Sequence, residues 1–200
     1  MQVKVLSESG FLEALLGIGL SFGLTSGKNY HEMLQDKDSA LWDRLHGIAE
    51  KLAHKGNAEN KFLRQISVVL DVDAPIYWWK QADTYKVGTT AQSESTMHTL
   101  KRTPITQDRF EHPIFPETIK HLEGLRQSGD FELLVNELPC GWLQRRILTY
   151  NYAVIQNIYQ QRRHHKLKEW HIFIDSVLNK LEFPYLITKD FIKGENDGRS

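Results

Sequence analysis

The chain has 200 residues, of which 40% are hydrophobic, with 25 basic and 25 acidic side chains. This length and composition fit one compact domain with its own core, and the balanced charge excludes a global positive field that would attract nucleic acid. The only cysteine, Cys140, cannot form an internal disulfide, which favours a reducing compartment. We therefore expect a cytoplasmic protein that binds no nucleic acid, with a single domain over residues 1–192 and a frayed tail at residues 193–200.

The N-terminal segment predicts a strand followed by a buried helix. The letters "QVKVL" are typical of a short strand, and the next helix begins near Ser7 or Ser9 and ends near Gly23. Its apolar stretch contains Glu13, is too short to span a bilayer and lacks the basic start of a signal peptide, so no membrane contact is expected. A second helix is predicted in "SALWDRLHGIAEKLAHKG", with an apolar face made of Leu41, Leu45, Ile48 and Leu52.

The segment "ISVVLDVDAP" predicts a half-buried strand with an inner face of Ile66, Val68, Leu70 and Val72. Asp73 is expected to cap a new helix that has Pro75 in its first turn. That helix carries Trp78, Trp79 and Gln81, and we interpret the tryptophans as core or interface residues.

A run rich in Ser and Thr, "GTTAQSESTMH", leaves the end of this helix and has more hydroxyl groups than a packed core uses. Residues 101–116 contain Pro104, Pro113 and Pro116 and are predicted to form a loop. A loop of that length is typical of a lid or of a subunit contact.

From Gln144 to about His164 the pattern predicts one long helix. A single stripe of this helix would carry Asn151, Ile155, Ile158 and Arg162, with Asn157 on a neighbouring face. Asn151 and Arg162 would then be about 16 Å apart, which is the scale of a nucleotide. The alternative is that both asparagines are satisfied core or interface amides and that Arg162 is a solvated residue at a helix end.

No metal site is expected. His164, His165 and His171 lie near Glu169, but their spacing is typical of solvated residues at a helix end. The chain also lacks the glycine-rich phosphate-binding motifs, and no activating base accompanies Cys140, which we interpret as a structural residue.

The stretch from Leu138 to Ile172 resembles, without gaps, the C-terminal signature of the flavin-dependent thymidylate synthases. Its matching residues are Leu138, Pro139, Thr149, Asn151, Asn157, Arg162 and the letters "KEWHI". Further upstream, "VDAPIYWWKQ" is similar to the strand, turn and helix that end in an Arg-Gln pair in that family. The run "TTAQSESTMH" stands where the family has its Ser-x-Asn-Glu-x-Ser-x-Arg loop.

This resemblance implies an α+β fold, with a twisted antiparallel or mixed sheet flanked by helices. It also implies a homotetramer with FAD and dUMP at subunit interfaces. The implied activity is flavin-dependent one-carbon transfer to a pyrimidine deoxynucleotide, with methylenetetrahydrofolate and NADPH as co-substrates. The alternative is a non-catalytic nucleotide-binding or assembly protein that keeps the fold without FAD.

Residue by residue, the resemblance assigns flavin contacts to Asn151, Asn157 and Lys86. It assigns substrate contacts to three residues, namely Gln81, Ser95 and Lys80. Arg162 matches the arginine that stands against the pyrimidine, where a guanidinium can hold negative charge that develops on the base.

Several cations of the family are replaced. The Arg-His-Arg triplet reads "TYK" from Thr84 to Lys86, or "YKV" if one residue is inserted so that Ser95 matches the loop serine. The loop arginine becomes Thr96 or Met97. Compensating cations would have to come from Lys80, Lys86, Arg145, Arg146 or Arg163.

Overall fold

The computed structural model describes residues 1–35, 39–56 and 58–189. The tail predicted at residues 193–200, and the domain boundary at residue 192, lie outside these ranges. No helix in the described ranges combines the length and the apolar character needed to cross a membrane.

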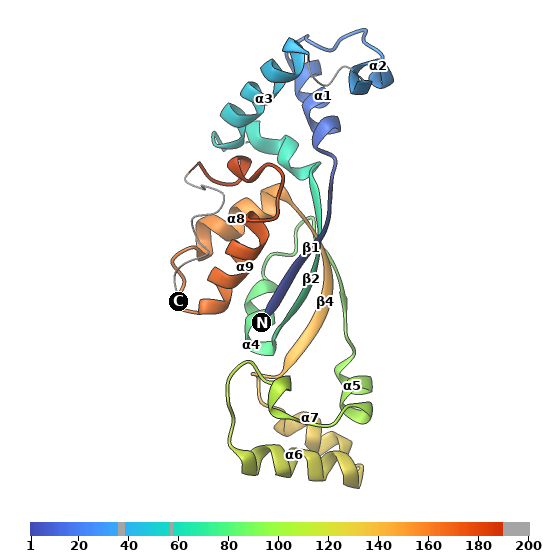
Figure 1. Ribbon diagram of the computed structural model, residues 1–200, viewed down its shortest axis with the longest axis vertical. Helices are drawn as coiled ribbons and strands as arrows, with labels where there is room; N and C mark the ends of the chain where they lie inside the picture. Colours follow the sequence, from blue (N-terminus) through green and yellow to red (C-terminus); the bar gives the residue numbers. More distant parts are fainter. Residues whose placement is uncertain (36–38, 57, 190–200) are drawn as a thin grey trace.

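A four-stranded antiparallel sheet forms the middle of the molecule (Figure 1), with the strand order β1-β2-β4-β3. Its strands are β1 (Gln2–Ser9), β2 (Ser67–Pro75), β3 (Thr90–Ser93) and β4 (Leu143–Asn151). Together with its flanking helices, this sheet confirms the expected α+β fold class.

The helices gather in three places (Figure 1). One end of the sheet carries α1 (Phe11–Ser21), α2 (Tyr30–Gln35), α3 (Ala40–Ala53) and the 3-10 helix η1 (Glu59–Arg64). One sheet face is covered by α4 (Ile76–Ala82), α8 (Tyr152–Arg162) and α9 (Lys168–Leu178). The 3-10 helix η3 (Pro184–Leu186) packs against α3. The other end holds α5 (Thr96–Arg102), the 3-10 helix η2 (Gln107–Arg109), α6 (Pro116–Ser128) and α7 (Phe131–Glu137).

The predicted first strand and first two helices are present as β1, α1 and α3. The predicted start of the first helix near Ser7 or Ser9 is wrong, because both residues lie in β1 and α1 begins at Phe11, after Gly10 with a φ of 88°. In α3 the deepest residues are Trp42, Leu45, Ala49 and Ala53. The predicted residues Leu41, Ile48 and Leu52 lie at the margin of the same core, half-buried. The buried stripe is therefore rotated from the predicted one, because the large indole of Trp42 packs inward.

Strand β2 alternates as predicted, and Val68, Leu70 and Val72 are fully buried. The predicted cap at Asp73 is wrong. Asp73 lies inside β2, paired with Gln2 on β1 and with Arg145 on β4. Because the sheet ladders hold the backbone as far as Pro75, helix α4 begins only at Ile76.

The predicted helix from Gln144 to His164 is wrong in its first half. Residues Leu143–Asn151 form β4, which pairs with β2 along its whole length and with β3 over four residues. Helix α8 begins at Tyr152. Its N-cap is Asn151, whose side chain accepts a hydrogen bond of 3.0 Å from Val154 N. Pairing with strands distant in sequence overrides the local helical pattern here.

Two cores stabilise the described fold. The main core lies between the sheet and its helices and contains four large aromatic side chains at its centre, Trp78, Trp79, Trp170 and Phe173. This burial confirms the interpretation of Trp78 and Trp79 as core residues. The second core joins α5, α6 and α7 and consists of Leu100, Ile105, Phe110, Leu122, Leu134 and Trp142.

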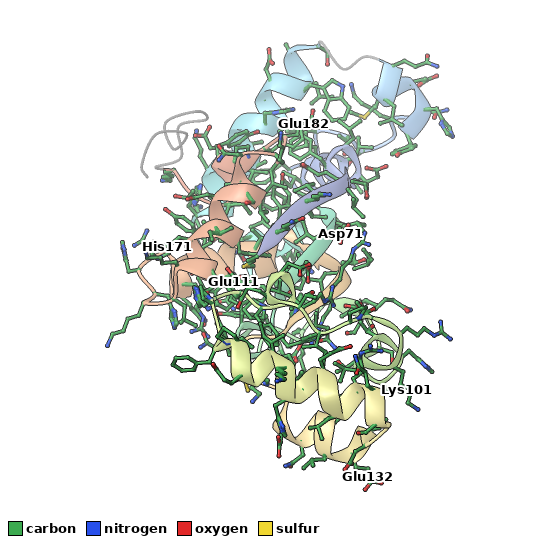
Figure 2. The ribbon with its side chains drawn as sticks, turned by 60° about the horizontal axis from the view of Figure 1, so that its bottom comes forward. Asp71, Lys101, Glu111, Glu132, His171 and Glu182 are labelled. Carbon is green, nitrogen blue, oxygen red and sulfur yellow. The ribbon has the colours of Figure 1, made fainter. Side chains whose placement is uncertain are left out.

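The predicted loop at residues 101–116 is partly structured. Lys101 and Arg102 belong to α5, and η2 lies within the segment. The segment is also fastened to the rest of the chain: Glu111 N donates to Gly141 O at 3.0 Å, and His112 Nε2 lies 3.3 Å from Glu169 on α9. These contacts join the end of the molecule that contains α5, α6 and α7 to the sheet and to α9. Figure 2 shows Lys101 and Glu132 at this end and Glu182 near the opposite end.

Candidate functional site

Gln81 lies at the end of α4, where the buried tryptophans of that helix anchor it to the core. Its Oε1 accepts a hydrogen bond of 2.9 Å from Nε1 of Trp170. Trp170 lies on α9 and is fully buried. The contact therefore joins two segments 89 residues apart, and it fixes the position of the Gln81 amide.

Arg162 is the last residue of α8, and it is half-buried. Its Nε donates to the Tyr85 hydroxyl at 2.9 Å, and its guanidinium carbon lies 5.0 Å from the Trp170 ring centroid and 5.7 Å from that of Tyr85. The next residue, Arg163, is exposed, and its guanidinium carbon lies 5.4 Å from the Tyr159 ring centroid. Arg162 is thus a positioned cation and not a solvated residue at a helix end.

Hydrogen bonds continue from Arg162 to Asn157. The Tyr85 hydroxyl donates to Gln161 Oε1 at 3.0 Å, and Gln161 Nε2 donates to Asn157 Oδ1 at 2.8 Å. Gln81, Asn157 and Arg162, which were predicted from the sequence as site residues, are therefore linked by three residues that were not predicted. We call the six residues the polar cluster: Gln81, Tyr85, Asn157, Gln161, Arg162 and Trp170.

Asn151 and Lys86 border the polar cluster through a tight turn. Asn151 Nδ2 donates to Gly88 O at 3.4 Å, while its Oδ1 caps α8. Gly88 has a positive φ of 75°, and a Cβ there would lie 2.8 Å from Asn151 Nδ2. Lys86 is exposed at the start of this turn, and its carbonyl accepts from Thr89 Oγ1 at 3.1 Å.

The other two predicted site residues do not join the polar cluster within this chain. The ammonium group of Lys80 is 3.4 Å from the Cys140 thiol, and both residues are exposed. Ser95 is the N-cap of α5, and its hydroxyl accepts from His98 N at 3.4 Å. Helix α5 stands at the α6–α7 end of the molecule in Figure 1, apart from α8 and α9.

Arg162 forms no ion pair with an acidic side chain in the described part of the chain. His165, which lies with its ring centroid 6.4 Å from that of Trp170, has its pKa lowered, by burial first and then by the charge of Arg162. Asp83, the acidic residue at the end of α4, is paired with Arg146 at 2.8 Å. The guanidinium group of Arg162 is therefore available to an acceptor from outside the chain.

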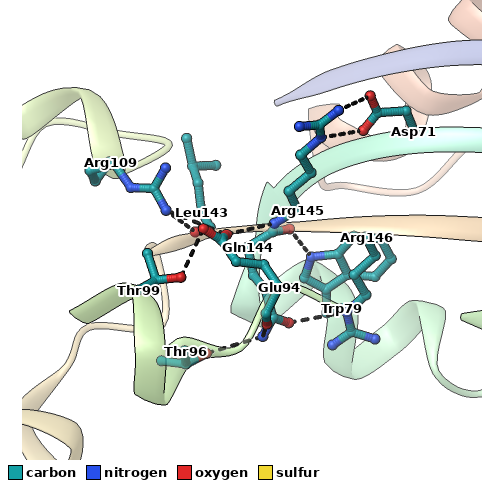
Figure 3. Close-up of polar contacts among 10 residues, drawn as sticks. All are labelled: Asp71, Trp79, Glu94, Thr96, Thr99, Arg109, Leu143, Gln144, Arg145 and Arg146. Atoms are coloured by element: carbon teal, nitrogen blue, oxygen red, sulfur yellow. Dashed lines mark hydrogen bonds and ion pairs between the residues drawn. The ribbon is translucent and has the colours of Figure 1, made fainter. Parts of the chain in front are cut away.

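A second polar network lies on the open face of the sheet (Figure 3). Arg145 forms two hydrogen bonds with Asp71, of 2.7 and 2.6 Å, which lower the pKa of that carboxyl. Asp73 beside them has its pKa raised by burial, and a cavity of about 380 Å³ is lined by Gln2, Lys4, Asp71, Asp73, Glu94, Arg109 and Arg145. Arg145 and Arg146 are paired with Asp71 and Asp83. They therefore do not compensate at the polar cluster for the cations that the family carries and this chain lacks.

No group of three or more His, Cys, Asp or Glu residues that could hold a metal ion occurs within the described ranges. The polar cluster and the turn at residues 86–89 fit an organic ligand better than a metal ion. In the described part of the chain the amide nitrogen of exposed Asn157 has no protein partner, and the exposed Lys86 adds a cation directly after Tyr85 in the chain. Such donors fit the phosphate and carbonyl oxygens of a flavin nucleotide.

Known protein-family models do not match the chain, and no curated protein matches its sequence. Solved structures do share its fold. A flavin-dependent thymidylate synthase, ThyX, from Helicobacter pylori, complexed with FAD and dUMP, has a TM-score of 0.72 and 14% identity over 94% of this chain and 99% of the other. A second structure of that organism's enzyme with FAD and dUMP has a TM-score of 0.72 and 13% identity, over 94% and 98% of the two chains.

A UMP/dUMP methylase, PolB, from Streptomyces cacaoi, bound with 5-Br dUMP, is also similar, with a TM-score of 0.53 and 13% identity over 78% of this chain and 74% of the other. At these identities the similarity establishes a common architecture. The chain has the fold of the flavin-dependent thymidylate synthases, as its sequence signature implied.

Sequence reasoning did not select Tyr85, Gln161 or Trp170 as site residues. Two signals were available: Tyr85 belongs to the altered triplet in either register, and Trp170 lies in the letters "KEWHI". Gln161 follows Asn157 by four residues, a spacing that brings side chains together on a helix. The contact between Tyr85 and Gln161 depends on packing between distant segments and leaves no local pattern.

Proposed function

We propose that this protein is a flavin-dependent enzyme that transfers a one-carbon unit to a pyrimidine deoxynucleotide, such as dUMP. The polar cluster carries the proposal, because hydrogen bonds and the contact of Arg162 with the Trp170 ring bring Gln81, Asn157 and Arg162 together. The cluster lies on a fold whose solved examples include complexes with FAD and dUMP. The lone cysteine supports a reducing, cytoplasmic location.

Arg162 is the residue that we assign to the base. Its Nε and one face of its guanidinium group are engaged by Tyr85 and Trp170, so its two terminal nitrogens remain for a ligand. A fixed guanidinium stabilises negative charge that develops on a pyrimidine during attack from C5. Gln81, held by Trp170, contributes a second donor at the same place.

Asn151, Asn157 and Lys86 are the residues that we assign to FAD. Asn151 is hydrogen-bonded to the turn at residues 86–89, and Lys86 begins that turn as an exposed cation. Asn157 lies on α8, six residues after Asn151, and accepts from Gln161. Bound FAD would supply the redox chemistry and the relay of the one-carbon unit from methylenetetrahydrofolate, with NADPH as the reductant. The protein residues bind and orient the reactants.

A homotetramer would complete this site. Lys80 and Ser95, which the resemblance assigns to the substrate, lie outside the polar cluster of their own chain. We propose that the β3–α5 segment of a neighbouring chain brings its Ser95 to the nucleotide. The exposed polar face of the sheet and the exposed side chain of Val87 beside Lys86 are consistent with such a contact.

A second candidate is a nucleotide-binding protein without catalytic activity. It is favoured by uncharged residues where the family carries arginines, namely Thr84 and Thr96 or, with one residue inserted, Tyr85 and Met97. The pairing of Arg145 and Arg146 with Asp71 and Asp83 also favours it. Fewer free cations remain for the phosphates of FAD. This candidate binds a pyrimidine nucleotide and forms no product.

The test is to incubate the purified protein with FAD, NADPH, methylenetetrahydrofolate and dUMP, and to measure dTMP by chromatography and NADPH oxidation by absorbance. We expect dTMP to form, and NADPH oxidation to depend on dUMP. Binding of dUMP in calorimetry without dTMP would favour the second candidate. A protein that binds neither dUMP nor FAD would overturn both candidate functions.

A further inference from the structure

A cavity of about 160 Å³ lies between α5, α6 and α7, at the end of the molecule that carries the second core (Figure 1). Its wall is mainly apolar and contains Leu100, Leu125, Phe131 and Leu134. Gly129 also lines the cavity, and a Cβ on this residue would meet no heavy atom within 4 Å. An engineered protein cavity of about 150 Å³ with a wall of Leu, Ile and Phe binds benzene. This cavity therefore has room for one aromatic ring.

Two cations, Lys101 and Arg126, also line the cavity, and one of them is already compensated. The Nε atom of Arg126 donates to the Glu123 carboxylate at 2.7 Å. Hydrogen bonding with Arg126 lowers the pKa of Glu123 to about 2, so this carboxylate is ionised at neutral pH and balances the charge of Arg126.

Lys101 supplies the charge that is not balanced. Its side chain is exposed, and its ammonium group lies 4.8 Å from the Phe131 ring centroid. It forms no ion pair with an acidic side chain in the described part of the chain. Asp130, which precedes Phe131, is the N-cap of α7, and its carboxylate accepts from Leu133 N at 3.4 Å. The cavity thus combines an apolar interior with one available cation on its solvent side.

We propose that this cavity binds a small carboxylic acid with an aromatic or branched aliphatic body, as the carboxylate anion. The body would lie against Leu100, Leu125 and Leu134, and the carboxylate would meet the ammonium group of Lys101. A mainly apolar pocket with a few polar groups is typical of a site for a small molecule. A helix of a partner protein, about 10 Å across, is too large for it. The inference goes beyond the proposed function, because the residues that line this cavity are different from those of the polar cluster.

Lys101→Met tests the contribution of the charge. Methionine keeps an unbranched side chain on α5 and removes the ammonium group. The matched control is Lys120→Met, because Lys120 is an exposed lysine on α6 that does not line the cavity. Ion pairs at exposed positions are weak and are screened by salt. We therefore expect Lys101→Met to weaken carboxylate binding about twofold to fivefold at low ionic strength, and less at high ionic strength.

Leu125→Trp tests the location of the ligand. Leu125 is half-buried on α6, and an indole at this position would occupy the space that the ligand needs. Leu133→Trp is its control, because Leu133 is an exposed leucine on α7 that does not line the cavity. Melting temperatures report whether each variant keeps the fold. If Leu125→Trp does not fold, the comparison of Lys101→Met with Lys120→Met decides.

The experiment measures dissociation constants of 4-fluorobenzoate and of its neutral counterpart, 4-fluorobenzyl alcohol, by fluorine NMR at low ionic strength. We expect the parent and both controls to bind the benzoate about twofold to fivefold more tightly than the alcohol. Lys101→Met should bind the two equally, and Leu125→Trp should bind neither. Acetate and inorganic phosphate, which lack an apolar body, should compete poorly with the benzoate.

Four results would each overturn the inference. They are a parent that does not bind the benzoate, equal effects of Lys101→Met and Lys120→Met, full binding by a folded Leu125→Trp variant, and competition by phosphate as strong as that by unlabelled benzoate. These results do not bear on the formation of dTMP, so the proposed function is tested separately.

Discussion

Replacement of Arg162 by Ala separates a positioned residue from a solvated one. The change removes a charged hydrogen bond to Tyr85 at 2.9 Å and a guanidinium group 5.0 Å from the Trp170 ring centroid. Half-burial reduces the first contribution to about 1 kcal/mol, and the cation–π contact adds about 0.5–1 kcal/mol. We therefore expect the free energy of unfolding to fall by about 2 kcal/mol, against a few tenths for a solvated helix end.

The assay is urea denaturation of the parent, Arg162→Ala, Arg162→Lys and the control Arg163→Ala. The control removes an adjacent exposed cation that lies 5.4 Å from the Tyr159 ring, so we expect a loss of about 0.5 kcal/mol. Lysine keeps the charge but not the planar fork, and we expect it to restore stability in part and transition-state stabilisation poorly. With dUMP turnover as a second readout, Arg162→Ala should lose about 2–4 kcal/mol of transition-state stabilisation. Equal effects of Arg162→Ala and Arg163→Ala in both assays would refute this reasoning.

Three further predictions concern pH, the proposed flavin turn and assembly. Arg126 lowers the pKa of Glu123 from 4.5 to about 2, so its stabilisation is present above about pH 4.5 and lost as the pH falls toward 2. Glu123→Gln should lower the free energy of unfolding by about 1–2 kcal/mol at neutral pH and not at about pH 2; a loss independent of pH would contradict this. Gly88→Ala should weaken FAD binding in fluorescence titrations, because its Cβ would meet Asn151 Nδ2 at 2.8 Å. Gly129→Ala is its control, with a similar positive φ of 80° and no heavy atom within 4 Å, and equal FAD affinities in the two variants would remove the turn from the site. Finally, light scattering at micromolar concentration should give the mass of a homotetramer, and the mass of a monomer would contradict the shared site.

The parts of the fold that were predicted correctly are those with a strong local pattern. Alternation in β2 shows directly in Val68, Leu70 and Val72, because one face of that strand is buried and the other is polar. Strand β4 was read as a helix because its inner face carries Arg146 as well as Leu148 and Tyr150, which weakens the alternation. Its structure is determined by pairing with strands far away in sequence, which no local window records.

The candidate site shows the same division between local and distant information. Gln81 and Arg162 were found through the family resemblance, and the structure places both against Trp170. Lys80 was expected beside Gln81, but successive residues on a helix point about 100° apart, and its ammonium group meets Cys140 instead. Helices α6 and α7, together with the second core that they share with α5, were not predicted from the sequence.

We expect this chain to bind a flavin and a pyrimidine nucleotide at the polar cluster, and a visible absorbance spectrum reports on both. The protein is incubated with FAD, freed of excess cofactor by gel filtration and scanned at about 450 nm, before and after the addition of dUMP. We expect a retained flavin band, close to one flavin per chain, that shifts when dUMP binds beside the flavin. A colourless protein after gel filtration, with no spectral change on adding FAD and dUMP together, would contradict it.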